Sequence, residues 1–458
     1  MILLMTTAPP EKDTWYHGKR LPPIGLMYVA GALEKAGYEV QMLDNYLANK
    51  PLEEVKQTVM QTKPFMVGIT CGSATFARCL QTAQAIKEAT PDCVVVVGGW
   101  HASYLPQTLL EHAQIDYAIL GEGERAITQL ANALSNGDKA QASTIPGVAS
   151  KTPNGININP PQFIEDMDEI PYPARHLLPL EQYDRTIEFL EAKPADVMSI
   201  SRGCVFSCGF CETRKLWGNI SRSFSPKRVL GEIQDLQNRY GTKGIYFIND
   251  NFTLHKEKTK ELCQLMIKEK LDLEWVCDTR TDLVDEELLE QMSKAGCKVI
   301  WFGVESGSPK VLNRIGRNTT PKQVQTTFKL CKKHHIKTAC SFMIGLPDET
   351  LADMEQSLKF AKKIDPDYCQ FNIFIAYPES KLYKELLQTN QYTQLDEYLL
   401  STKNSEYDFE TLKTVQRRFF KSFHMAPKQI LKRAKREGML NFAKTRLLHG
   451  TKKTNGTA

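Results

Sequence analysis

The sequence has no long apolar run. Of its 458 residues, 42% are hydrophobic and 24% are charged, and no stretch approaches the roughly 18 consecutive apolar residues that cross a bilayer. The opening residues MILLMTTAPP have neither the basic lead nor the small-residue cleavage site of a secretory signal, and we interpret them as a first strand. These absences favour a cytoplasmic protein, and the length predicts two or three domains.

The twelve cysteines lack the context of a disulfide framework. They are spread through a long chain without a secretory segment, and cysteines in such chains are usually reduced thiols or metal ligands. Internal repeats and low-complexity tracts are missing too. We therefore expect a globular protein whose cysteines are core residues or ligands.

An alternation of β-rich and helical runs begins at the N-terminus. It predicts βαβ units around a parallel sheet, in which CVVVVGG is a strand buried on both faces. Residues 146–190 are rich in Pro, Asn and Gly, which indicates a connection between domains. Six further strands then alternate with helices, and six βα units can form an open three-quarter barrel.

The predicted fold class is therefore α/β. We expect a doubly wound, Rossmann-like domain over residues 1–145, a linker over 146–190, a partial (β/α)6 barrel over 191–385 and a basic helical segment over 386–458. Both sheet types bind ligands at the carboxyl ends of their strands, so the loops there are the places to search for function.

Three closely spaced cysteines follow the first predicted strand of the barrel. They are Cys204, Cys208 and Cys211 in SRGCVFSCGFC. Thiolates are the ligands of iron–sulfur clusters, and a loop with this spacing can hold three corners of a 4Fe–4S cubane. The fourth iron would then accept the amino and carboxylate groups of S-adenosylmethionine (SAM). A zinc site is the alternative, but zinc normally takes four ligands in paired CxxC-like spacing, and no second pair follows.

This loop resembles that of the radical SAM superfamily. The hallmark of that family is CxxxCxxC with an aromatic residue just before the last cysteine, here Phe210. The resemblance covers about residues 195–385. It implies that the three cysteines are catalytic, because they hold the cluster that cleaves SAM.

Later segments resemble the SAM-binding motifs of that family, in the order that it requires. Candidate cofactor contacts at these strand ends are Asp250, Asn251, Arg280, Glu305, Ser306, Gly345, Leu346, Pro347 and Glu349. The resemblance implies that IYFINDNF, in place of a Gly-Gly-Glu motif, binds the SAM ammonium, that WFGVESGS contacts ribose and methionine, and that FMIGLPDET packs on adenine. Arg280, in CDTR, is a candidate for binding the SAM carboxylate, because a guanidinium matches the geometry of a carboxylate. Singly, each could be an ordinary strand-end carboxylate or a turn glycine.

The loops at the strand ends of the first domain are ambiguous by themselves. Candidate ligand contacts there are Thr70, Ser73, Gly98, Gly99, His101 and Gly121. The glycines would let the backbone approach a large planar or phosphate-bearing ligand, but tight turns explain them equally well. A lone histidine beside two glycines is either a cofactor contact or a satisfied loop residue.

Joined to a radical SAM barrel, this domain resembles the cobalamin-binding domain of the B12-dependent radical SAM proteins. The resemblance rests on LPPIGLMYVAGALEKAGYEVQMLD, VGIT, VVVVGGWHAS and YAILGEGE. That group includes C-methyltransferases and ring-forming enzymes, among them the anaerobic porphyrin cyclase and hopanoid methylases. The DxHxxG motif by which classical B12 domains supply a histidine to cobalt is absent, as in many members of the group. The resemblance implies cobalamin as a third cofactor.

The chemistry implied by this resemblance is radical modification of an unactivated carbon in a small-molecule or lipid substrate. SAM cleavage would yield a 5'-deoxyadenosyl radical that removes a hydrogen atom. Methylcobalamin would then deliver a methyl group, or cobalamin would assist ring closure. An electron donor such as flavodoxin or ferredoxin is implied as a partner.

Three other interpretations stay open. Methylthiotransferases also join a three-cysteine domain to a radical SAM barrel, but Cys71, Cys79 and Cys93 occupy strand and helix positions typical of core residues. The first domain could instead bind only a partner or the substrate. A nonenzymatic iron–sulfur carrier would not need the ordered SAM-binding segments.

Basic residues concentrate at the C-terminus. Residues 411–458 contain thirteen Lys or Arg and one acidic residue, Glu437, in a chain of net charge +5. We expect helices that dock on the barrel and leave a solvated basic face. Peripheral association with anionic lipid, or attraction of an acidic substrate, is the alternative. No nucleic-acid-binding motif accompanies the charge, so we expect no nucleic-acid partner.

Overall fold

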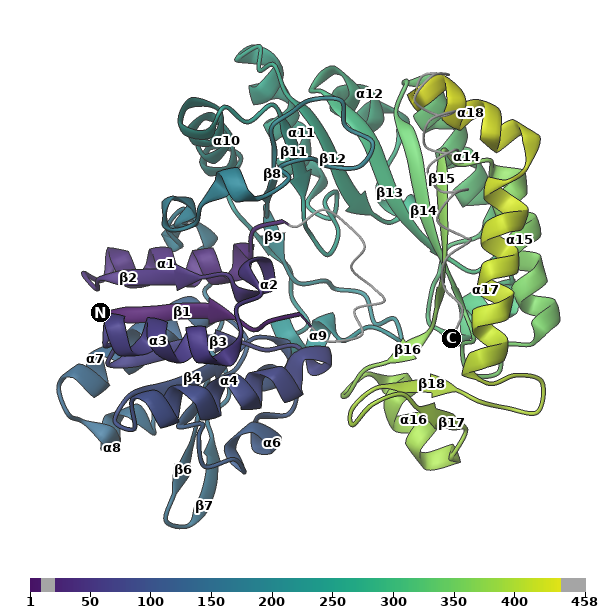
Figure 1. Ribbon diagram of the computed structural model, residues 1–458. Coiled ribbons are helices and arrows are strands. Elements are labelled where there is room, and N and C mark those ends of the chain that lie inside the picture. Colours follow the sequence, from purple (N-terminus) through teal and green to yellow (C-terminus); the bar gives the residue numbers. More distant parts are fainter. Residues whose placement is uncertain (10–20, 438–458) are drawn as a thin grey trace, which may run out of the picture.

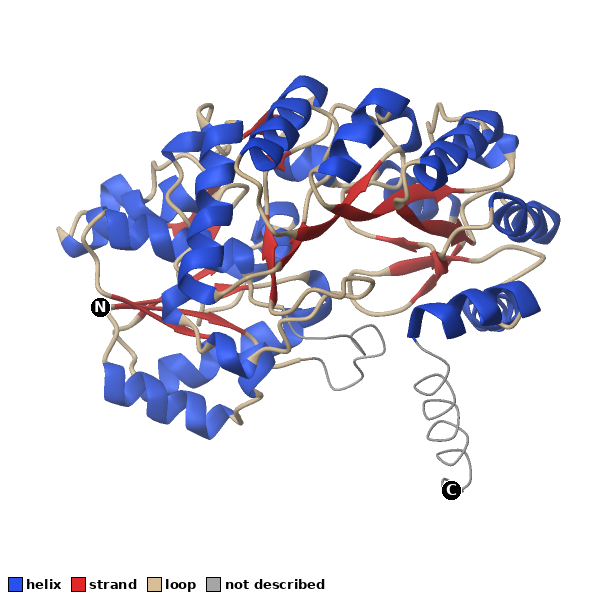
Figure 2. Cartoon of the chain, turned by 90° about the horizontal axis from the view of Figure 1, so that it is seen from above, coloured by secondary structure: helices blue, strands red, loops and turns tan. Residues whose placement is uncertain are grey.

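The molecule contains two large sheets of mainly parallel strands, and these sheets lie side by side (Figure 1). The computed structural model describes residues 1–9 and 21–437. Seen from above, the strands of the first sheet lie between two layers of helices, whereas the helices of the curved second sheet lie on its outer side (Figure 2). Within the described ranges, no helix is long and apolar enough to cross a bilayer.

The first sheet has the order β2-β1-β3-β4-β5-β6-β7, with five parallel strands and a terminal antiparallel hairpin. Its strands are β1 (Ile2–Thr6), β2 (Val40–Leu43), β3 (Met66–Thr70), β4 (Val94–Gly98), β5 (Tyr117–Ile119), β6 (Val148–Thr152) and β7 (Gly155–Ile158). The hairpin falls inside the Pro-rich stretch that we interpret as a linker. Its two short strands extend the first sheet because β6 pairs with the free edge of β5.

Helices cover both faces of this sheet, as the doubly wound prediction requires. One face packs on α1 (Ile24–Lys35) and α7 (Gly123–Ser135), and the other on α3 (Leu52–Thr62) and α4 (Phe76–Ala89). The two-residue period of a strand produces this division, since Leu4 faces the first helix pair and Leu3 faces the second. Short helices complete the domain: α2 (Asn45–Ala48), α5 (Trp100–Tyr104), α6 (Pro106–Leu110) and α8 (Lys139–Ala142).

The second sheet contains six parallel strands in the order β15-β14-β13-β12-β11-β8. They are β8 (Ala195–Met198), β11 (Gly244–Phe247), β12 (Glu274–Thr279), β13 (Cys297–Glu305), β14 (Lys337–Ile344) and β15 (Tyr368–Ile373). The outer helices are α10 (Pro226–Tyr240), α11 (Lys256–Lys268), α12 (Glu286–Lys294), α14 (Pro321–Lys333) and α15 (Leu351–Ile364), with α13 (Pro309–Arg314) after β13. Since β8 and β15 do not pair, the barrel is open, as predicted.

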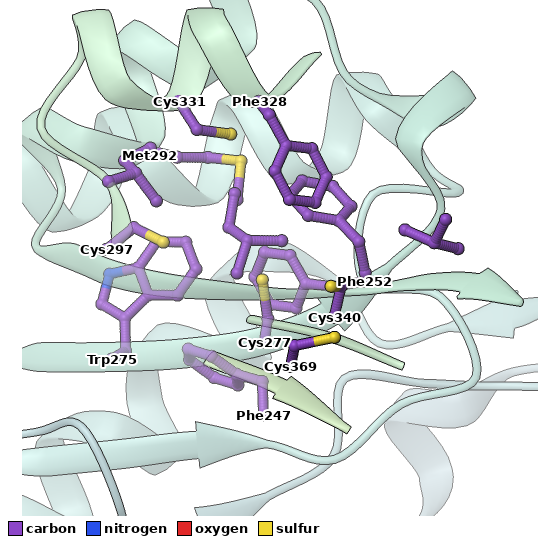
Figure 3. Close-up of a cluster of buried hydrophobic side chains, with 14 of the residues drawn as sticks. Phe247, Phe252, Trp275, Cys277, Met292, Cys297, Phe328, Cys331, Cys340 and Cys369 are labelled. Carbon is purple, nitrogen blue, oxygen red and sulfur yellow. The ribbon is translucent and has the colours of Figure 1, made fainter. Parts of the chain in front are cut away.

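The core between this sheet and its helices is rich in aromatic rings and sulfur (Figure 3). Trp275 is fully buried and packs edge-on against Phe247. The cysteines of this core are all buried: Cys263, Cys277, Cys297, Cys331, Cys340 and Cys369. The three cysteines of the first domain are buried in its core as well, so nine of the twelve serve packing.

The C-terminal segment covers the open edge of the barrel. Helix α17 (Phe409–His424) runs beside β15 (Figure 1), where Phe419 and Phe423 pack on Phe371. Before it, α16 (Lys381–Thr389) adjoins a small antiparallel sheet of β16 (Ile375–Ala376), β17 (Tyr392–Gln394) and β18 (Leu400–Thr402). Helix α18 (Pro427–Glu437) follows, and the rest of the predicted helical segment lies outside the described residues.

Candidate functional site

The three-cysteine loop lies between the two domains, after β9 (Ser201–Arg202) and before α9 (Thr213–Trp217) (Figure 1). Strand β9 pairs with β10 (Arg222–Ser223) and so holds both ends of the segment together. Cys204 and Cys208 are buried, and Cys211 is half-buried. Burial raises the pKa of the Cys204 and Cys211 thiols.

Nitrogen donors surround these thiols. Asn251 Nδ2 donates to Cys204 Sγ at 3.2 Å. The Nη1 atoms of Arg280 and Arg317 lie 3.9 Å and 3.8 Å from Cys208 Sγ. Donors and positive charge favour the thiolate form that metal binding requires.

A single metal ion and a cluster require different arrangements of the three thiols. Among residues 1–9 and 21–437, no three His, Cys, Asp or Glu side chains converge tightly enough to hold one ion. A cubane needs a wider arrangement, since each of three irons takes one cysteine. The three cysteines therefore match the ligand set of a 4Fe–4S cluster with one open iron.

Asp250 supports the loop from the end of β11. Its two carboxylate oxygens accept from Gly203 N at 2.8 Å and from Thr213 Oγ1 at 3.0 Å, while the Cys211 thiol donates to the same hydroxyl at 3.2 Å. Burial raises the pKa of Asp250. The carboxyl group thus connects both ends of the loop and also faces the adjoining cavity.

That cavity, which we call the main cavity, has a volume of about 830 Å³ and lies between the domains. The first domain contributes Trp100 and Tyr104 to its wall, and the second contributes Cys211, Glu305 and Ser341. Because it opens at the C-terminal ends of the barrel strands, it occupies the position where such barrels hold their substrates.

The predicted SAM contacts divide into two groups around this cavity. Phe210, Asp250 and Glu305 line it, whereas the others stand outside its wall: Asn251, Arg280, Ser306, Gly345, Leu346, Pro347 and Glu349. Glu305 has a left-handed backbone (φ 68°) at the end of β13, and its carboxylate lies 3.6 Å from Arg317. Burial raises the pKa of Glu305 in spite of this cation.

Arg280 and Ser306 form closed local networks. The Arg280 guanidinium donates twice to Asp282, at 2.8 Å and 2.7 Å, and stacks on the Phe206 ring at 3.7 Å. Ser306 Oγ accepts from Ser308 N at 3.1 Å and lies 3.2 Å from Ser357 Oγ. Both side chains therefore support the loops around the cavity.

Glu349 organises the turn after β14. Its Oε2 atom accepts from the backbone nitrogens of Gly345, at 2.7 Å, and Leu346, at 3.0 Å. Tyr407 adds a hydroxyl that donates to the carbonyls of Leu346 and Glu349. Burial raises the pKa of Glu349 to about 8. The Glu349 carboxyl group thus fixes the shape of this turn.

A second cavity of about 350 Å³ lies at the strand ends of the first domain. The predicted contacts Thr70, Gly98, Gly99 and Gly121 line it. Gly99 has φ 95°, a conformation that favours glycine, while a Cβ built on Gly98 would meet nothing closer than 4.0 Å. Its remaining wall is mostly aliphatic, so the cavity suits a flat apolar group set against bare backbone.

The two cavities share a wall. Trp100, Arg202, Leu216 and Trp217 line both, and Trp100 is 63% exposed. A ligand that extends from the strand ends of the first domain therefore reaches the barrel mouth directly.

His101 and Ser73 lie away from both cavities. The His101 imidazole is fully buried, with Nδ1 3.2 Å from Ser73 Oγ and Nε2 2.9 Å from Thr108 Oγ1. Burial lowers the pKa of His101 to about 4. Both ring nitrogens of His101 thus have hydrogen-bond partners within the protein. This geometry does not support the prediction that His101 and Ser73 contact a cofactor.

Sequence reasoning missed an ionic network that joins the domains. Arg202 Nη1 donates to Glu122 Oε1 at 3.0 Å and to Glu124 Oε2 at 3.2 Å, and Arg222 Nη1 donates to Glu122 Oε2 at 2.8 Å. The side chains of Arg202, Glu122 and Glu124 are buried, and that of Arg222 is 9% exposed. The GEGE motif pointed to its glycines, yet its glutamates make these contacts across 78 to 100 residues of sequence.

Known protein families match both domains. The radical SAM superfamily matches residues 198–361, and the B12 binding domain matches residues 17–131. An uncharacterized methyltransferase of Pyrococcus horikoshii is 32% identical over 421 residues, covering 90% of this chain and 89% of the relative. The anaerobic magnesium-protoporphyrin IX monomethyl ester cyclase of Rubrivivax gelatinosus is 32% identical over 372 residues, covering 80% of this chain and 66% of the cyclase.

Solved structures share the two-domain fold. The radical SAM methyltransferase TsrM of Kitasatospora setae, solved with cobalamin and a 4Fe–4S cluster, has a TM-score of 0.70 at 20% identity, over 85% of this chain and 74% of TsrM. The cobalamin-dependent enzyme OxsB, with aqua-cobalamin bound, has a TM-score of 0.76 at 15% identity, over 88% of this chain and 64% of OxsB. The family matches confirm the three expected cofactors, a 4Fe–4S cluster, SAM and cobalamin. The chain therefore belongs to the radical SAM superfamily, among the enzymes whose radical SAM domain follows a B12 binding domain.

Proposed function

We propose that this cobalamin-dependent radical SAM enzyme methylates an unactivated carbon of a small-molecule or lipid substrate. The observation that carries the proposal is the shared wall between the cavity at the first domain's strand ends and the main cavity beside the cysteine loop. A methyl carrier in the first cavity and a radical source in the second would meet across that wall. The methyltransferase from Pyrococcus, at 32% identity, supports this reaction class.

Cys204, Cys208 and Cys211 would hold the cluster. Asn251, Arg280 and Arg317 would donate to their sulfurs, and such donors help to set the reduction potential of the cluster. Asp250 and Glu305 face the main cavity and would receive the ammonium and hydroxyl groups of SAM.

The first domain would hold cobalamin through Thr70, Gly98, Gly99 and Gly121. Bare glycine backbone lets a large ring approach closely. Ser73 and His101 would act only by shaping the loop, through the hydrogen bond that joins them. When bound, the reduced cluster supplies the electron that cleaves SAM, and cobalamin supplies a carrier for the methyl group.

The protein's own contribution would be orientation and exclusion of water. Trp100, Leu216 and Trp217 present apolar surface between the cavities, and such a wall keeps a reactive carbon dry while it is held in position. We also propose a flavodoxin or ferredoxin as electron donor, because SAM cleavage consumes one electron, and a cytoplasmic location on the sequence grounds given above.

Ring formation is the second candidate. The 32% identity to the Rubrivivax cyclase is the observation in its favour. In that reaction the substrate would gain no methyl group. The mass of the product formed from a candidate substrate separates the two reactions, because methylation adds one CH2 unit and ring closure removes hydrogen.

The test begins with anaerobic reconstitution of the full chain with iron, sulfide and hydroxocobalamin, followed by desalting, absorbance spectroscopy and an assay for 5'-deoxyadenosine. We expect retained cobalamin and SAM cleavage. Replacing the three loop cysteines with alanine should abolish the cluster signal and cleavage, while Cys263→Ala, in the core of α11, serves as the control. Cleavage that persists in the triple variant would refute the cluster assignment.

A second variant tests the first domain alone. Gly98→Leu adds a side chain at a residue that lines the smaller cavity, and its Cβ would meet no atom closer than 4.0 Å. We expect loss of retained cobalamin with the cluster absorbance intact. Equal cobalamin retention in this variant would refute the assignment of that cavity.

A further inference from the structure

A groove of about 330 Å³ lies beside the open edge of the barrel, between β15 and α17. On the strand side it is lined by Tyr368, Gln370, Phe371 and Asn372. Of these, Tyr368, Gln370 and Asn372 alternate with the buried Cys369, Phe371 and Ile373. The two-residue period therefore turns three of the four groove residues toward the interior of the barrel.

The groove adjoins the main cavity. Asn372 lines both spaces, and its side chain forms no hydrogen bond with the described part of the chain. Within the described residues no strand pairs with the outer edge of β15, where Gln416 of α17 instead donates to Phe371 O. The two spaces therefore meet at Asn372.

The helix side of the groove carries two cations around an aromatic ring. Arg417 and Lys421, one helical turn apart, line it together with Gln416 and with Phe420, a residue that is 48% exposed. Neither cation forms an ion pair with a carboxylate of residues 1–9 or 21–432.

Other cations on the C-terminal helices differ in this respect. Lys413 pairs with Glu410, Arg418 with Glu355, and both Lys428 and Lys432 with Asp365. Among the Lys and Arg side chains that the structure describes on α17 and α18, the two without a carboxylate partner are thus the two that face the groove. Positive charge without a carboxylate, beside aromatic surface, matches a ligand that has an anionic group on an apolar body.

We propose that this groove is the lateral arm of the substrate site and binds a phosphate or carboxylate group of the substrate. The proposal rests on the proposed function, and it adds a substrate class: an anionic molecule with an apolar body, whose reacting carbon lies in the main cavity. Arg417 and Lys421 bind the anion, and Phe420 covers the adjoining apolar part.

The test is isothermal titration calorimetry of the full chain with n-decyl phosphate below its micelle concentration. We expect binding to wild type and about tenfold or weaker binding to Arg417→Gln/Lys421→Gln, because charge-assisted hydrogen bonds are lost. The matched control is Lys413→Gln/Arg418→Gln, which removes the same charge from the same helix and should bind like wild type. Circular dichroism verifies that each variant is folded.

Three further probes separate the sources of the anion. Inorganic phosphate and n-decanol should each bind much more weakly than n-decyl phosphate, since each offers only half of the recognised chemistry. Phosphate that binds as well as decyl phosphate would overturn the apolar part of the proposal. Binding to phosphatidylglycerol vesicles without binding of monomeric decyl phosphate would indicate a membrane surface and overturn the substrate assignment.

Equal affinity in the groove variant and wild type would overturn the proposal, as would no binding to wild type. These outcomes are distinct from failure of the proposed function, because the titration needs no cofactor. A chain that binds decyl phosphate through Arg417 and Lys421 but retains no cobalamin would keep the groove and refute the reaction.

Discussion

Single buried polar groups set the shape of the loops around the site. Glu349 is the clearest case, since one carboxylate oxygen accepts two backbone N–H groups of the turn after β14 while the other oxygen has no hydrogen-bond partner in the structure. Burial outweighs the two hydrogen bonds and raises its pKa from the ordinary 4.5 to about 8. The folded chain therefore holds the Glu349 proton more tightly than the unfolded chain does.

This residue predicts a pH dependence of stability. A raised pKa gives stabilisation that is fully present below pH 4.5 and is lost as the pH rises through about 8. Glu349→Gln cannot lose a proton, so the melting temperature of wild type relative to this variant should fall by a few degrees between about pH 5 and 9. Thermal unfolding by circular dichroism at several pH values measures the difference. A constant difference would show that Glu349 titrates normally in the folded chain.

Asn251 predicts an effect on the cluster. Its amide donates to Cys204 Sγ at 3.2 Å, and a donor to a ligand sulfur stabilises the more negative, reduced state. Asn251→Leu removes this hydrogen bond and should destabilise the reduced cluster by about 1 kcal/mol relative to the oxidised cluster. The reduction potential should therefore fall by about 40 mV. A redox titration followed by electron paramagnetic resonance measures it, with the exposed Asn313→Leu as control. An unchanged potential would remove Asn251 from the cluster environment.

Among the elements, α17 closes the side of an incomplete barrel. Phe419 is fully buried against Phe371, and Gln416 Nε2 donates to Phe371 O at 2.7 Å. The next residue, Phe420, points to the groove and is half exposed. Two adjacent phenylalanines thus have opposite roles, one in packing and the other at the surface.

The expected cost of truncation differs accordingly. Phe419→Ala should lower the free energy of unfolding by about 3–5 kcal/mol, because it leaves a cavity in the core. Phe420→Ala should lower it by less than about 1 kcal/mol, since an exposed side chain gains little from folding. Urea unfolding of both variants compares them directly. Similar losses would contradict the orientation of α17 on β15.

The elements also show how far the sequence predicts the fold. Alternating apolar runs predicted the parallel strands, because buried strands such as Val94–Gly98 have a strong local signal. The hairpin Val148–Ile158 and the small sheet around Leu400 were not predicted, since these short strands are partly polar and gain stability only by pairing with distant edges. In the site, the cysteine spacing was visible locally, whereas the contacts of Arg202 with Glu122 depend on tertiary structure.

Across the whole molecule, one buried ionic network joins the two domains. Arg202 and Arg222 from the barrel side meet Glu122 and Glu124 from the first domain. Removal of a cation leaves a buried carboxylate charge without a partner, and such a charge is costly away from water. Buried ionic networks are therefore sensitive to single substitutions. The relative placement of the cavities therefore depends on these four side chains.

Arg202→Gln should lower the free energy of unfolding of the cofactor-free chain by about 3–5 kcal/mol. Combining it with Glu124→Gln should recover part of the loss, because the two residues form a coupled pair. Arg125→Gln breaks an exposed pair with Glu169 and should change stability by less than about 1 kcal/mol. Additive effects of the two buried substitutions, seen in a double-mutant cycle by urea unfolding, would argue against coupling across the interface.

The shared wall of Trp100, Leu216 and Trp217 also limits how such an enzyme can diversify. A substitution there alters both cavities at once. A change that enlarges the main cavity for a larger substrate would therefore also weaken cofactor binding in the smaller cavity. Side chains that border the main cavity alone, such as Ile248, Met343 and Phe374, are free of that conflict. We therefore expect substitutions that adapt the enzyme to new substrates to occur at these positions, while the residues of the shared wall stay the same.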